Sequence, residues 1–119
     1  MRYVDGFVVP VPEQNIKLYR SIAQKAGKIW KEHGALEYIE AAGDDLDNNW
    51  GVPFTKAVKL KPGETPFFSF IVYKSRADRD KVNKKVMSDP RMKKIMESGP
   101  MPFDAKRMVY GGFKSLIDM

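Results

Sequence analysis

The sequence predicts an α+β domain in which one antiparallel sheet carries both main helices on the same face. Three observations favour this class. The length of 119 residues is that of one domain, so residues 1–119 are expected to form a single unit. Segments with strand-like and helix-like periodicity alternate along the chain. The sequence holds no cysteine, so its core cannot depend on disulfides or thiolate metal sites.

The first half of the chain predicts a strand, a helix and a strand. Residues 2–9 are rich in β-branched and aromatic side chains, and the prolines that follow are expected to end this strand. Residues 13–33 carry apolar side chains at spacings of three and four, which predicts an amphipathic helix closed by Gly34. Residues 35–43 are expected to form the second strand.

The second half predicts further strands and two helices. Residues 54–60 are expected to form a strand whose two lysines suit a sheet edge, and residues 67–73 form the strongest strand of the chain. Ser75 can cap the helix that follows. A short helix is expected from Asp89 to about Ser98, and a last strand over residues 107–113.

Apart from the additional edge strand at 54–60 and the short helix at 89–98, the predicted order is the βαββαβ arrangement of ferredoxin-like folds. The strand over 67–73 is apolar on both of its faces, because Phe68 and Phe70 alternate with Phe67 and Ile71. Helices can cover one face only. The other is expected to be covered by the same face of a second copy, which gives a homodimeric α/β barrel.

The net charge of +6 comes from one segment, residues 74–94. Its expected basic surface includes Lys81, Lys84, Lys85 and Lys94, which could attract RNA or an acidic partner. The alternative is a solvated helix face that keeps the protein soluble. We favour the second interpretation, and nucleic acid is not the expected partner, because no aromatic residues that could stack on bases lie among these lysines.

Few residues predict chemistry. Asp5 lies between apolar neighbours in a strand, so it needs a cation, and Arg107 or Lys106 at the start of the last strand is the expected partner. His33 ends the first helix and is either a packed histidine or a proton carrier at a pocket. Asn83 is expected in a polar network. One histidine and an incomplete calcium-loop pattern at 45–56 predict no metal site.

Five segments resemble the bacterial YbaA-like family, whose domain has no known function. They are the start Tyr3-Val4-Asp5-Gly6-Phe7-Val8-Val9 with Val11-Pro12, the short run Gly34-Ala35-Leu36, the pattern Tyr73, Ser75, Arg79-Asp80 and Asn83, the run Met87-Ser88-Asp89-Pro90-Arg91-Met92, and the run Met101-Pro102-Phe103-Asp104 followed by Lys106-Arg107-Met108 and Tyr110-Gly111-Gly112-Phe113. The resemblance implies a dimeric α/β barrel and no particular reaction. It also implies a candidate site at Asp104, Lys106, Arg107 and Tyr110.

We therefore expect a homodimer with a small-molecule pocket between sheet and helices. One alternative is a cofactorless monooxygenase-like enzyme in which Tyr3, Asp5, His33, Asn83 and Arg107 converge in one cavity. The other is a module that binds RNA or an acidic partner through residues 74–94. No cofactor is expected. The sequence lacks a membrane-length apolar run and a signal peptide, which predicts a cytoplasmic protein that does not contact membranes.

Overall fold

A computed structural model describes residues 1–119 and contains one four-stranded antiparallel sheet. The strands are β1 (Tyr3–Pro12), β2 (Glu37–Ala42), β3 (Glu64–Tyr73) and β4 (Val109–Lys114), in the spatial order β2-β3-β1-β4. The helices are α1 (Ile16–Glu32), α2 (Phe54–Ala57), α3 (Arg76–Met87) and α4 (Pro90–Glu97), with short 3₁₀ turns at Glu13–Asn15 and Ala105–Arg107. This is the predicted ferredoxin-like arrangement. None of the helices combines the length and apolar character needed to cross a membrane.

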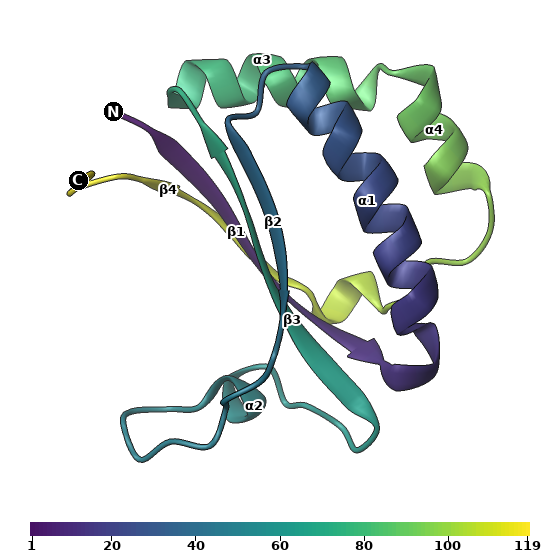
Figure 1. The fold of residues 1–119 in the computed structure, drawn as a ribbon, viewed down its shortest axis with the longest axis vertical. Helices are drawn as coiled ribbons and strands as arrows, with labels where there is room; N and C mark the ends of the chain where they lie inside the picture. Colours follow the sequence, from purple (N-terminus) through teal and green to yellow (C-terminus); the bar gives the residue numbers. More distant parts are fainter.

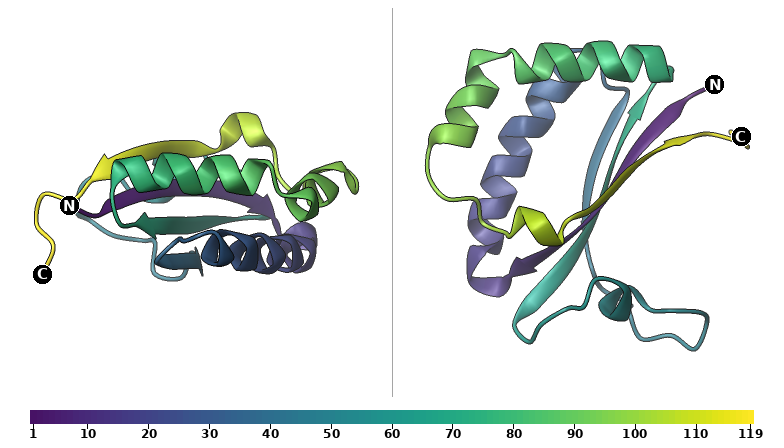
Figure 2. Two further views of the ribbon diagram at one scale, coloured as in Figure 1. Left: turned by 90° about the horizontal axis from the view of Figure 1, so that it is seen from above. Right: turned by 180° about the vertical axis from the view of Figure 1, so that it is seen from behind.

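Helices α1, α3 and α4 lie on one side of the curved sheet, and α2 with its flanking loops lies toward the other side (Figure 1). The view from behind shows α1, α3 and α4 together on one side of the curved sheet (Figure 2). The core lies between these layers. Its two clusters centre on Tyr73 with Val86, which are fully buried, and on Val11 with Tyr19. Burial of these apolar side chains holds the helices on the sheet.

The segment 54–60 is not the strand that the sequence predicts. Residues Phe54–Ala57 form the single helical turn α2 after Pro53, and Lys59 adopts a positive φ of 51° that interrupts regular structure. The Phe54 ring packs edge-on against Phe68 of β3, with centroids 5.8 Å apart. A tertiary contact across the sheet therefore decides the conformation of this segment, against its strand-like composition.

Two strand boundaries also differ from prediction. Strand β1 continues through Pro10 to Pro12. Strand β4 pairs with β1 only as far as Val8, so beyond Val8 one side of β1 is a free sheet edge. Proline is tolerated at such an edge, because its missing N–H removes no hydrogen bond there. The last strand begins at Val109, since residues Ala105–Arg107 form a 3₁₀ turn. Asp104 caps this turn, because its Oδ1 accepts from the Lys106 amide at 3.0 Å.

The sheet face that no helix covers is apolar, and we call it the open face. Pairing places alternate residues of all four strands on it, because directly opposed residues share a face. Phe68 is 45% exposed and Phe113 63% exposed there. Its apolar residues are Ile39, Ala41, Phe68, Phe70, Val72, Val4, Gly6, Val8, Val109, Gly111 and Phe113, and pairing also places the charged Glu37, at the start of β2, on it.

Candidate functional site

Three of the predicted polar residues meet under α3. Asp5 of β1 is 1% exposed, and the nearest cation is Arg79 of α3, whose Nε lies 3.5 Å from Asp5 Oδ1. Arg79 donates to the Tyr3 hydroxyl at 3.0 Å and its guanidinium lies 4.8 Å from the centre of the Tyr3 ring. Asn83 Oδ1 accepts from the Tyr73 hydroxyl at 3.1 Å. These contacts join β1 and β3 to α3.

The expected pairing of Asp5 with Arg107 or Lys106 is wrong. Arg107 donates to Glu64 Oε1 at 2.9 Å and to the Lys59 carbonyl at 3.0 Å, at the far end of the sheet. The register explains the error. Asp5 pairs with Gly112 of β4, so Arg107 lies beyond the last paired position of β1. The carboxyl of Asp5 meets Arg79 instead, and burial raises its pKa despite that neighbour.

Gly112 makes this network possible. A Cβ at this position would lie 2.4 Å from the Tyr3 hydroxyl oxygen and 2.7 Å from Arg79 Nη2. Both groups therefore pack against bare backbone of β4. Asp5 and Arg79 line neither of the two cavities described below. These buried contacts connect the sheet to α3. They also reach α1, because Trp30 of α1 donates to Asn83 Oδ1 at 3.0 Å.

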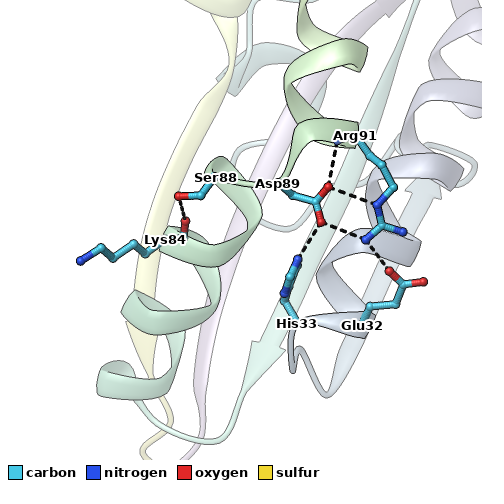
Figure 3. A network of polar contacts seen from close by, with 6 residues as sticks. All are labelled: Glu32, His33, Lys84, Ser88, Asp89 and Arg91. Carbon is cyan, nitrogen blue, oxygen red and sulfur yellow. Dashed lines mark hydrogen bonds and ion pairs between the residues drawn. The ribbon is translucent and has the colours of Figure 1, made fainter.

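His33 belongs to a different network, at the C-terminal end of α1. Its Nε2 lies 2.8 Å from Asp89 Oδ2, and Arg91 bridges Asp89 to Glu32 (Figure 3). Asp89 also caps α4 by accepting from the Arg91 amide at 2.8 Å. Hydrogen bonds from Arg91 and then His33 hold the pKa of Asp89 well below its usual range. These contacts tie α1 to the junction of α3 and α4.

The structure thus does not bring the predicted enzyme residues into one cavity. Tyr3, Asp5 and Asn83 meet, whereas His33 and Arg107 lie elsewhere. The candidate residues implied by the resemblance are also dispersed. Asp104 and Lys106 are exposed at the 3₁₀ turn, and Tyr110 of β4 stacks on Phe7 with ring centres 4.9 Å apart.

A cavity of about 330 Å³ lies between the sheet, α1 and the segment from α4 to β4, and we call it the inner cavity. Twenty residues line it, and eighteen of these are hydrophobic. Five of the lining residues are methionines, whose flexible thioethers fit irregular apolar spaces. The principal lining side chains are Phe7, Ala26, Trp30, Met87, Met92, Met96, Met101, Phe103 and Met108.

Glu40 of β2 is the only charged residue that lines the inner cavity. Its Oε1 accepts from the Tyr19 hydroxyl at 2.7 Å and its Oε2 from the Tyr38 hydroxyl at 3.0 Å. No lysine or arginine forms an ion pair with it. Burial raises the pKa of Glu40, and hydrogen bonds from Tyr19, Tyr38 and Ser69 oppose that rise only in part.

A second hollow of about 890 Å³ runs between α1 and β2, and we call it the outer groove. Tyr19, Ala23, Tyr38 and Glu40 line both the outer groove and the inner cavity. These four residues therefore lie where the two spaces meet. Gly27 of α1 permits the close packing here, because a Cβ would lie 2.7 Å from the Tyr38 ring.

The comparisons with known proteins agree with this fold. A family model described as a protein of unknown function, DUF1428, matches residues 2–105. The uncharacterized protein YbaA of Escherichia coli K12 is 50% identical over 118 residues, and the match covers 99% of each chain. The chain belongs to this family. The same identity and coverage hold for the YbaA protein of Shigella flexneri.

Solved structures similar to this YbaA-family chain show the fold alone, since their sequences have diverged. Rv0793 of Mycobacterium tuberculosis has a TM-score of 0.61 and 11% identity, covering 99% of this chain and 98% of its own. A nipsnap family protein with unknown function from Agrobacterium tumefaciens has a TM-score of 0.58 and 14% identity, covering 96% and 87%. A dimeric ferredoxin-like protein from an uncultured marine organism has a TM-score of 0.50 and 12% identity, covering 100% and 98%.

The basic residues of the YbaA-family chain are spread over several helices. Lys81, Lys84 and Lys85 are exposed on α3, and Lys94 is exposed on α4. Helix α1 adds further exposed bases, which the expected basic segment at 74–94 leaves out. They are Lys17, Arg20, Lys25, Lys28 and Lys31.

Sequence reasoning missed Glu40 and Arg79. Strand parity could have found Glu40, because positions 38, 40 and 42 share a face and Tyr38 belongs under the helix. Arg79 lies one turn after the Ser75 cap, where it resembles any solvated helix arginine. Nothing local distinguishes it.

Proposed function

We propose that this protein is a homodimer that binds a small, largely apolar organic molecule in the inner cavity of each chain. The apolar cavity with a single carboxylate at its edge carries this proposal. Pockets for small molecules are concave and mostly apolar, with few polar groups that fix orientation. The outer groove gives a ligand its path from solvent.

The dimer is proposed from the open face. Isolated chains rarely expose a contiguous apolar surface of this kind, and two such faces can pack about 10 Å apart as a two-sheet sandwich. The dimeric ferredoxin-like neighbour gives independent support, since its described assembly is a dimer of chains with this fold. The sheet would then assemble through one face and bind ligand through the other.

The two tryptophans allow a direct test of ligand binding. Trp30 lines the inner cavity, whereas Trp50 is 90% exposed in the loop before α2. In the Trp50→Phe protein, Trp30 is the only indole. N-phenyl-1-naphthylamine, a neutral apolar fluorophore, is expected to bind at one molecule per chain and to quench Trp30 by energy transfer.

Filling the cavity provides the control. Ala26 lines the inner cavity, so Ala26→Leu in the Trp50→Phe background should weaken probe binding about tenfold or more, while Ala77→Leu on the exposed surface of α3 should not. Ala23→Leu serves the same purpose if Ala26→Leu disturbs folding by circular dichroism. Equal quenching in the filled and control variants, or no quenching at all, would contradict the proposed site.

A further inference from the structure

The chain supplies no counter-ion to Glu40, since no lysine or arginine forms an ion pair with it. An ionised carboxylate offers about four lone-pair positions, and the Tyr19 and Tyr38 hydroxyls occupy two of them. Both donors are neutral. A half-buried carboxylate without a cation is costly, so this site gains more from a charged partner than from a further neutral donor.

Two tyrosines contact this carboxylate through their hydroxyls, and further aromatic rings pack on these tyrosines. Tyr19 packs on Phe67 with ring centres 4.8 Å apart, and Tyr38 packs on Trp30 with ring centres 6.1 Å apart. Tyr19, Tyr38 and Trp30 all line the inner cavity beside Glu40. Aromatic faces together with a carboxylate are the arrangement that favours organic ammonium groups, because the ring faces are electronegative.

We propose that the ligand of the inner cavity carries a protonated amine that pairs with Glu40 while its apolar body occupies the methionine-lined space. This rests on the proposed function above and specifies its ligand class. The amine would take a lone-pair position of Glu40 that the two tyrosine hydroxyls leave open, and it would lie against the Tyr19 and Tyr38 rings. The same geometry disfavours a carboxylate ligand, whose charge would face that of Glu40.

Three basic residues of α1 line the outer groove and repel an approaching cation. Arg20, Lys28 and Lys31 are exposed to solvent, and Glu32 lines the same groove. Water and salt screen these charges within about 8 Å at physiological ionic strength. Glu40 is half-buried, and it makes its contact at hydrogen-bond distance, where screening is weak. The rim therefore slows entry of an amine more than it reduces equilibrium binding.

Three probes with the same aromatic body test the proposal by titration calorimetry on the intact protein. They are 2-phenylethylamine, 2-phenylethanol and 3-phenylpropionate. The amine is expected to bind about tenfold tighter than the alcohol, with the carboxylate weakest. Glu40→Gln should bring the amine within about twofold of the alcohol. Glu37→Gln, on the same strand but the opposite face, should keep the full preference.

The outcomes separate the two proposals. If the alcohol and the amine bind the wild-type protein equally, or if Glu40→Gln keeps the preference for the amine, the amine proposal is wrong while the cavity proposal stands. If N-phenyl-1-naphthylamine binds but none of the three probes binds or displaces it, the amine proposal is wrong and the cavity proposal stands. If N-phenyl-1-naphthylamine itself does not bind, the proposed function fails. Tyr19→Phe keeps the carboxylate and the ring, so it should retain the preference for the amine.

Discussion

Arg79 and Asp5 face each other inside the protein with neither charged group fully satisfied. Arg79 Nε lies 3.5 Å from Asp5 Oδ1, and neither of these two buried atoms has a hydrogen-bond partner. Arg79 instead donates to Tyr3, and Asp5 is 1% exposed. This pair connects β1 to α3. Its main contribution to stability is that neither charged group is buried without a partner.

The Asp5–Arg79 pair predicts strong coupling in a double-mutant cycle. Asp5→Asn or Arg79→Met alone should reduce the free energy of unfolding by about 3–5 kcal/mol, because one buried group loses its partner. The double variant should cost clearly less than the sum. Urea unfolding measures all three. Arg107 pairs with Glu64 and not with Asp5. The destabilisation caused by Arg107→Met should therefore add to that caused by Asp5→Asn within about 0.5 kcal/mol. Coupling to Arg107 instead of Arg79 would refute the assignment.

The open face predicts that one substitution abolishes the dimer. Phe68 is 45% exposed on this face and Leu18 is 50% exposed on α1, so the two form a matched pair. Phe68→Lys should give a monomer at micromolar concentration in sedimentation equilibrium, because lysine charges would face the partner sheet. Leu18→Lys should remain a dimer. A wild-type monomer, or dissociation by Leu18→Lys alone, would exclude the open face as the interface.

Glu40 predicts a pH-dependent effect on stability. Burial raises its pKa in the folded protein, so the folded state binds its proton more tightly than the unfolded chain does. Stability from this group is therefore full below the unfolded pKa and is lost as pH rises through the folded value. The melting temperature of Glu40→Gln minus that of the wild type should be larger at pH 7 than at pH 4. An unchanged difference would mean that Glu40 is not desolvated.

Gly27 predicts an exception to a common rule. Replacing a glycine inside a helix with alanine ordinarily stabilises it by about 0.5–1 kcal/mol. At Gly27 the new Cβ would lie 2.7 Å from the Tyr38 ring, whose hydroxyl donates to Glu40. Gly27→Ala should therefore fail to stabilise the protein and should weaken probe binding. A thermal melt and a fluorescence titration check both effects. Normal stabilisation with unchanged binding would show that Tyr38 is free to move.

The sequence predicted the helices, strands and topology of this fold better than its side-chain contacts. Periodicity found α1, β1 and β3, because burial of one face imposes a repeat that composition reveals. It failed at Phe54–Ala57, where packing on Phe68 outweighs local preference. The partner of Asp5 was missed because strand register decides it. Register places Arg107 beyond the reach of Asp5, and Arg79 approaches from a helix 74 positions later in the chain.

A crystal structure of the protein with N-phenyl-1-naphthylamine tests the central claim most directly. That claim assigns one face of the sheet to assembly and the other to a ligand. We predict density for the probe beside Trp30 and Glu40, with two chains packed through Phe68 and Phe113. A cavity filled by its own side chains, or a probe bound on the open face, would contradict it.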